Sequence, residues 1–220
     1  LKNGVNIFSG RAKRVVILSN AVMLDEAPAQ TDFAKKDHNT VCCTGSLTYR
    51  RGITHLIRAA HKASVKLILA GRYESEAYQK QLEQMPEYGC VEYLGYLDRE
   101  GIAQVYERSS IGMSTILNVG QYASLDNLPT KVYEYMAAGL PVVASDYPFM
   151  RSAMQEDGFG IAVDPANVDQ IAQAIRQILD HPDQAAQMGQ NGRRAVQQKY
   201  NWGIEEHKLL ELYRSLAGCR

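Results

Sequence analysis

One carboxylate on a short predicted helix is the residue of this sequence best placed to do chemistry. The run NVGQYASLDNLPTKVYEYMAAGLPVVA predicts a polar loop and then a helix that begins near Pro129 and ends at Gly139, because proline suits the first helical turn and glycine the position just past the end. Glu134 lies in this helix among apolar neighbours, where an unpaired carboxylate is costly. A pair of ligand hydroxyls would satisfy it, and pairing with Lys131 or a neighbouring helix is the alternative.

Two further segments are suited to bind an anion. Thr130 and Lys131 open the same predicted helix, where unpaired backbone N–H groups favour phosphate. The loop TGSLTYRRG leaves a predicted strand; Gly45 permits close approach of the backbone, and Arg50 and Arg51 add cationic donors before the next helix. A solvated turn is the alternative interpretation of the two arginines.

A third pair of loops, GRYES and LGYLDR, also follows predicted strands. Arg72 in the first and Tyr96 and Leu97 in the second offer a guanidinium, a ring and backbone groups that could receive a nucleobase. Packing at the domain boundary is the alternative for Tyr96, and a simple surface charge is the alternative for Arg72.

The elements that must position these residues are strands and helices in alternation. Amphipathic segments predict helices, one with Ile53, Leu56, Ile57 and Ala60 on a single face and one with Asp98 as its N-cap. Strands are predicted by short, nearly continuous apolar runs, which suit parallel strands covered on both faces. These runs are RVVILS, TVCCTG, VKLILAG, VEYLG, IGMST and PVVAS.

Alternating strands and helices predict an α/β fold with a doubly wound parallel sheet, Rossmann-like in architecture. After residues 160–163 the chain is predicted to be almost wholly helical, with a last helix from about Trp202 to Leu216. Ligands of such sheets bind in the crevice at the carboxyl ends of the strands. We therefore expect the polar loops described above to converge.

Composition and spacing exclude several classes of function. Lysine plus arginine and aspartate plus glutamate both number 24, so no global field favours nucleic acid. The histidines have no metal-ligand spacing, the sequence contains neither GxGxxG nor a Walker A motif, and no nucleophilic triad can be assembled. The four cysteines have no CxxC spacing, and the apolar runs are too short to span a bilayer. We expect a soluble, cytoplasmic domain without a metal.

The stretch LPTKVYEYMAAGLPVVAS resembles the donor-site helix and following strand of the GT-B retaining glycosyltransferases of family 4, the glycosyl transferases group 1. VVILSNAV, TGSLTYRRGITHLIRAA, VEYLGYL, DPANVDQIAQAI and YNW support the resemblance in the right order. Together they cover nearly the whole chain and are similar to the C-terminal, donor-binding domain of these enzymes.

The resemblance implies roles for individual residues. Glu134 matches the second glutamate of the Glu-x7-Glu motif and holds the ribose hydroxyls, while Asp126 stands in place of the first, one methylene shorter. In the family that carboxylate and the amides after it, here beginning with Asn127, contact the transferred sugar. Arg51 matches the lysine of the diphosphate clamp. Ser46 stands where many members carry arginine, so the clamp lacks one cation unless Arg50 or Arg72 reaches it.

The resemblance further implies transfer of a hexosyl unit, with retention, from a nucleoside diphosphate sugar to a glycan, lipid or polysaccharide precursor. No metal or cofactor is required, and UDP is favoured over GDP or ADP as the donor nucleotide. Residues 1–14 are then a linker or tail, 15–200 the donor-binding domain, and 201–220 a helix that crosses back to an N-terminal acceptor-binding domain. Without that domain we expect little transfer; peripheral membrane association would depend on it.

Two other classes of function remain as alternatives at this point. A non-catalytic module that binds a nucleotide or sugar phosphate would share the same residues. A pyridoxal-phosphate-dependent phosphorylase is disfavoured, because no lysine stands out as the cofactor's attachment site.

Overall fold

A six-stranded parallel sheet forms the centre of the computed structural model, which describes residues 16–26, 33, 36, 38–119 and 127–217. The strand order is β3-β2-β1-β4-β5-β6, so the chain winds outward in both directions from the β1–β4 pair. This order confirms the doubly wound sheet. The strands are β1 Thr40–Leu47, β2 Lys66–Tyr73, β3 Val91–Tyr93, β4 Ile111–Ser114, β5 Val142–Ser145 and β6 Gly160–Val163.

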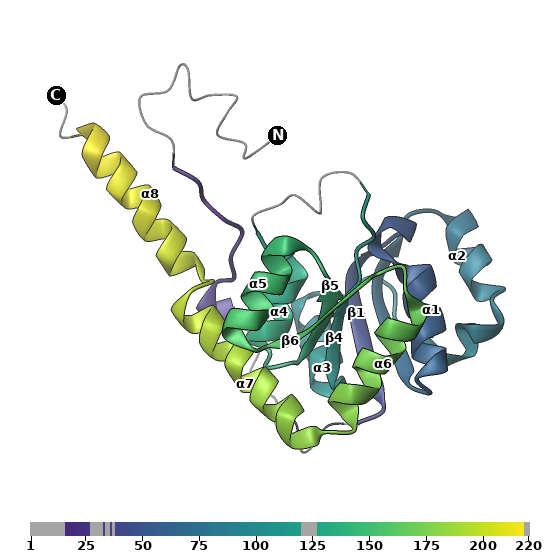
Figure 1. Cartoon of the computed structure of the whole chain (residues 1–220). Helices are drawn as coiled ribbons and strands as arrows, with labels where there is room; N and C mark the ends of the chain where they lie inside the picture. The colour runs from purple at the N-terminus through teal and green to yellow at the C-terminus, as the bar shows by residue number, and fades with distance from the viewer. Residues whose placement is uncertain (1–15, 27–32, 34–35, 37, 120–126, 218–220) are drawn as a thin grey trace.

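Helices cover both faces of the sheet (Figure 1). On one face α1, α2 and α6 pack against Val41, Leu67 and other strand residues, while α3, α4 and α5 pack against Cys42, Ile68 and others on the opposite face. The helices are α1 Ile53–Lys62, α2 Glu76–Glu83, α3 Arg99–Arg108, α4 Thr130–Ala137, α5 Pro148–Asp157, α6 Val168–Leu179, α7 Pro182–Gln198 and α8 Trp202–Ala217.

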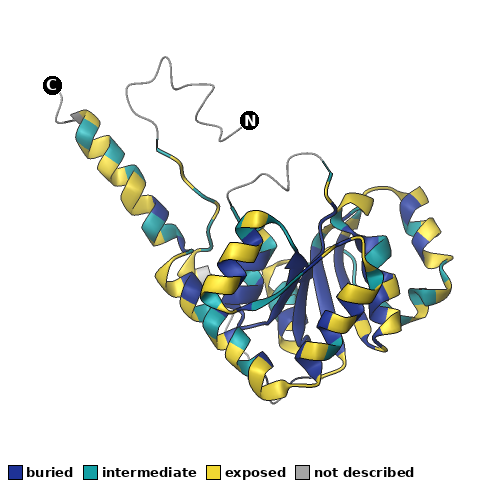
Figure 2. Ribbon diagram, in the orientation of Figure 1, coloured by how far each residue is buried: buried dark blue, intermediate teal, exposed yellow. Residues whose placement is uncertain are grey.

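Alternate residues of the central strands point to opposite helical layers, and both sets are buried (Figure 2). This explains why the strands read as continuous apolar runs rather than as alternating ones. The helix predictions follow the same logic: Ile53, Leu56, Ile57 and Ala60 are all fully buried on α1. Hydrophobic periodicity therefore identified the elements that carry the site.

Two predicted helix boundaries are confirmed by their capping groups. The Asp98 side chain accepts a 2.9 Å hydrogen bond from the Gly101 N–H at the start of α3. α4 begins directly after Pro129, and Gly139 follows its end with a φ of +73°, the left-handed conformation that glycine adopts without strain. Both helices thus begin beyond the carboxyl ends of the preceding strands, where a ligand crevice is expected.

The strand predicted at RVVILS is wrong for residues 16–19, which the structure describes without strand pairing. This segment runs beside the start of α8 instead. The Ser19 N–H donates to Glu205 Oε2 at 3.0 Å, and the Trp202 N–H donates to the Val22 carbonyl at 2.8 Å. Ile17 is 63% exposed. Apolar, β-branched composition cannot show whether a sheet edge is available for pairing, and the sixth strand is β6 instead.

The C-terminal helix α8 extends away from the layered body (Figure 1). Leu210, Tyr213 and Leu216 are large apolar side chains on it that remain exposed. Among the described residues, no helix combines the length and the apolar character needed to cross a bilayer.

Candidate functional site

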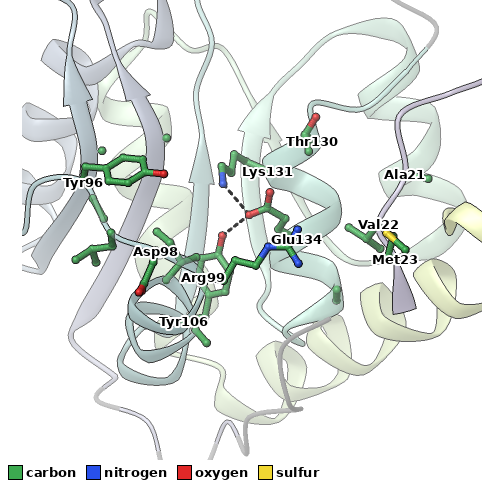
Figure 3. A pocket seen from close by; sticks show the side chains of 17 residues that line it. Ala21, Val22, Met23, Tyr96, Asp98, Arg99, Tyr106, Thr130, Lys131 and Glu134 are labelled. Carbon is green, nitrogen blue, oxygen red and sulfur yellow. Dashed lines mark hydrogen bonds and ion pairs between the residues drawn. The ribbon is translucent and has the colours of Figure 1, made fainter. Parts of the chain in front are cut away.

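A pocket of about 560 Å³ opens at the carboxyl ends of β1 and β2, next to the point where the sheet winds in opposite directions. This volume suits a small-molecule ligand. Its walls come from the β1 and β2 ends, α3, α4 and residues 21–23 (Figure 3). The lining residues are Ala21, Val22, Met23, Gly45, Ala70, Gly71, Tyr96, Leu97, Asp98, Arg99, Ile102, Ala103, Tyr106, Thr130, Lys131, Glu134 and Ala137.

Glu134 faces this pocket from α4, and its carboxylate is held by two donors. Glu134 Oε2 accepts from Lys131 Nζ at 2.7 Å and from the Tyr106 hydroxyl at 2.8 Å. The two partners come from α4 itself and from α3 across the pocket (Figure 3). The ion pair with Lys131 is therefore present, and the carboxylate nevertheless lines the pocket with its side chain 27% exposed.

Tyr106 connects Glu134 to a buried polar network that the sequence did not reveal. Its hydroxyl lies 3.2 Å from Thr44 Oγ1, and the Tyr135 hydroxyl accepts from the Thr44 N–H at 3.0 Å. Burial, with Tyr135 and Glu134 contributing next, raises the pKa of Tyr106 well above its usual value. The phenol therefore stays protonated and serves as a permanent donor to Glu134.

Six of the predicted site residues line the pocket: Gly45, Tyr96, Leu97, Thr130, Lys131 and Glu134. Tyr96 is 69% exposed, which argues against the packing alternative. Thr130 and Lys131 form the first turn of α4, and no described side chain caps that helix start. Of the first-turn N–H groups, that of Val132 donates to the Pro129 carbonyl at 2.9 Å, and those of Thr130 and Lys131 are the candidates for contact with a ligand.

The other predicted residues lie outside the pocket lining. Ser46 and Arg50 are exposed, and Arg51 is half-buried at the end of a 3-10 turn, Tyr49–Arg51. Arg72 lies with its guanidinium carbon 4.7 Å from the centre of the Tyr96 ring, beside the rim.

The loop before α4 is described only in part. The Tyr133 hydroxyl donates to Asn127 Oδ1 and so ties that residue to the helix. Asp126 lies outside the described residues, so its predicted role is untested.

Several lining residues were not predicted from the sequence. Ile102 and Ala103 follow from the position of α3, whose apolar face was recognised but not assigned to a pocket. Val22 and Met23 follow the run at residues 14–19, which was predicted as a strand of the sheet and not as part of a pocket wall. Their position depends on contact with the start of α8, which is about 180 residues away in sequence.

Comparison with known proteins places this geometry in a family. A family model described as Glycosyl transferases group 1 matches residues 26–195. A GDP-mannose-dependent monoacylated alpha-(1-6)-phosphatidylinositol monomannoside mannosyltransferase from Corynebacterium glutamicum is 24% identical over 182 residues, which are 80% of this chain and 47% of that protein. The chain spans less than half the length of several curated relatives that it matches.

Solved structures share the fold. Anabaena HepE in complex with UDP superimposes with a TM-score of 0.76 at 18% identity, over 95% of this chain and 60% of that one. The C-terminal domain of a glycosyl transferase group 1 family protein from Francisella tularensis gives a TM-score of 0.67 at 19% identity, over 82% and 98% respectively. The chain therefore belongs to the glycosyl transferases group 1 family and has the fold of the C-terminal domain of such an enzyme.

Proposed function

We propose that this domain binds the nucleotide of a nucleoside diphosphate sugar and, joined to an acceptor-binding domain, transfers the hexosyl unit with retention. The observation that carries the proposal is the position of Glu134. It presents a carboxylate to a pocket at the switch point of the sheet, one turn from a helix start whose backbone donors are uncapped by side chains. Ribose hydroxyls and phosphate oxygens need this pair of groups side by side.

In this proposal each part of the donor meets one part of the pocket. The base lies against Tyr96 and the backbone of Leu97, the ribose hydroxyls donate to Glu134, and the diphosphate meets the first turn of α4 at Thr130. Arg51 stays assigned to the diphosphate, and Asp126 with Asn127 to the transferred sugar, on the resemblance alone. These groups would lie between α3 and α4, which both contribute to the walls of the pocket.

The mechanism we propose is displacement on the front face of the sugar. The acceptor hydroxyl bonds to the anomeric carbon on the side from which the nucleoside diphosphate departs, and its proton passes to the leaving phosphate oxygen. Backbone donors at the start of α4 and nearby cations stabilise the negative charge that grows on that oxygen. Because these donors are already oriented, they cost little reorganisation during the reaction.

The direct test is binding of nucleoside diphosphates to the 220-residue chain. Isothermal titration with UDP, GDP and ADP should give saturable binding, with UDP first. GDP is the rival, since the Corynebacterium relative is GDP-mannose-dependent whereas HepE was solved with UDP. If none of the three binds at millimolar concentration, the proposal is wrong. If one of the three does bind, an assay of transfer after an acceptor-binding domain has been added would distinguish an enzyme from a binding module.

Replacing Tyr106 with phenylalanine should weaken UDP binding about 3- to 10-fold, because one of the two donors that hold Glu134 is lost. A hydrogen bond to a charged group contributes about 1.5–3 kcal/mol, and only part of this is lost from binding because Lys131 still holds the carboxylate. The role is one of positioning, so the loss should shrink when 2′-deoxy-UDP replaces UDP. Tyr88→Phe is the matched control, since it also removes one tyrosine hydroxyl and the hydrogen bond that this hydroxyl makes, here with the Tyr73 hydroxyl and away from the pocket. Equal losses for the two variants would contradict the role.

The acceptor-binding domain is proposed to meet α8. This helix extends from the body with Leu210, Tyr213 and Leu216 exposed, and residues 16–23 run beside its first turn. We propose that residues 1–14 link the two domains, that residues 15–200 bind the donor, and that 201–220 cross to the partner domain. Any association with a membrane surface is assigned to that partner domain.

A further inference from the structure

The pocket lining contains a cation that does not come from the β1 loop, at the helix start where the diphosphate is proposed to lie. Ser46 and Arg50 are exposed at the end of β1, and Arg72 lies against Tyr96. None of these three lines the pocket. Lys131 does, from the first turn of α4.

The Lys131 side chain extends over the end of β1. A Cβ built on Gly45 would lie 3.2 Å from Lys131 Cε, so the lysine stem packs on this glycine. Burial raises the pKa of the Cys43 thiol to about 12, with Cys42 acting in the same direction, while the charges of Arg51 and Lys131 act against it. Both cations therefore lie close enough to β1 to act on the same thiol.

The ammonium is also held beside Glu134. Lys131 Nζ lies 2.7 Å from Glu134 Oε2, with the two side chains 29% and 27% exposed. Among the described residues this is the single hydrogen bond that the structure gives the ammonium, which can donate three. Within the described part of the chain the structure gives the other two donors no acceptor, so we assign them to an anion, while the carboxylate accepts from hydroxyls next to it.

We infer that the Lys131 ammonium binds the diphosphate of the donor, in place of the arginine that Ser46 replaces at the end of β1. This inference rests on the proposed function and adds a side-chain role to the backbone role of the same residue. On binding, Glu134 receives the ribose hydroxyls and Lys131 the phosphate oxygens. The ion pair between them thus orients two groups that recognise adjoining parts of one ligand.

The rival explanation is that Lys131 only neutralises Glu134. The two explanations predict different values for the ratio of UDP affinity to uridine affinity in a Lys131 variant. This ratio measures the contribution of the diphosphate, because the two ligands differ only in that group. Titrations followed by protein-detected NMR reach the millimolar constants expected for uridine. If the ammonium contacts phosphate, Lys131→Gln should lower this ratio about 10- to 100-fold, as removal of a charge-assisted hydrogen bond does. Uridine affinity should change far less.

Three further variants complete the test. Lys131→Arg keeps the charge and should keep most of the ratio. Glu134→Gln should weaken both ligands together and leave the ratio unchanged or higher, because the ammonium is released. Lys80→Gln on α2, exposed and outside the pocket lining, controls for net charge and should change neither constant.

Arg99, which lines the pocket from the start of α3, is the competing cation. A ratio that falls in Arg99→Gln and changes less than twofold in Lys131→Gln would overturn the inference, as would no change in either. If the unaltered chain bound no nucleoside diphosphate, the proposed function would fall together with it. If UDP binds and only the Lys131 ratio is unaffected, the proposed function stands and this inference alone fails.

Discussion

Replacing Glu134 with alanine should weaken binding of UDP about 100-fold. The carboxylate is proposed to accept from two ribose hydroxyls, and hydrogen bonds to a charged group contribute about 1.5–3 kcal/mol each. The loss of affinity is partly offset, because the Lys131 ammonium is released from its ion pair with Glu134 and becomes available to phosphate. Isothermal titration measures the loss directly. The informative comparison uses 2′-deoxy-UDP, which should bind the unaltered chain more weakly than UDP does but should bind Glu134→Ala almost as UDP does.

A second carboxylate provides the matched control. Glu92 on β3 has the same 27% side-chain exposure as Glu134 and pairs with two cations, Lys66 and Arg108, but it lies outside the pocket lining. Glu92→Ala should leave nucleotide affinity unchanged. If replacing UDP with 2′-deoxy-UDP lowers the affinity of Glu134→Ala as much as it lowers that of the unaltered chain, Glu134 does not hold the ribose.

Gly71→Ala should destabilise the domain by about 3 kcal/mol or more, or prevent folding. Gly71 has a φ of +152°, and a Cβ there would lie 1.6 Å from the carbonyl oxygen of Gly45 on the neighbouring strand. Backbone atoms must move to remove such a clash, and both glycines stand in register in the β1–β2 pair. Changes of this kind belong to the most damaging class of single substitutions.

Chemical denaturation followed by circular dichroism measures this effect. Gly89→Ala is the control, since no described atom lies within 4 Å of a Cβ built at Gly89, and surface substitutions of this type change stability by about 0.5 kcal/mol or less. Unfolding free energies within 1 kcal/mol of each other for the two variants would show that the close approach of β1 and β2 is not required.

The fold was largely predictable because its signals are local. Ile53, Leu56, Ile57 and Ala60 repeat with the helical period and are fully buried, and Asp98 caps the helix that its spacing predicted. Short apolar runs identified five strands of the sheet correctly. The run at residues 14–19 has the same composition, yet its described part pairs with no strand, because pairing depends on a neighbour that composition does not specify.

The side-chain contacts of the site were predictable within one helix but not between helices. Thr130, Lys131 and Glu134 occupy one helix, and their spacing alone places them together. The hydroxyl of Tyr106, by contrast, reaches Glu134 from 28 residues away in sequence. Both the ion pair and the ligand role of Glu134 could be formulated from the sequence. Only the structure shows that the ion pair lies within the pocket, so that the ion pair and the proposed ligand role are compatible.

The wall formed by residues 21–23 affects how any measured affinity should be interpreted. This wall lies outside the sheet and is joined to the body through the Val22–Asn201 bridge and contacts with the start of α8. A ligand that touches Val22 on one side and Glu134 on the other restricts the motion of one segment relative to the other, and such ordering opposes binding entropically. Affinity at this pocket therefore combines contact energy with the entropic cost of fixing residues 21–23 relative to α4.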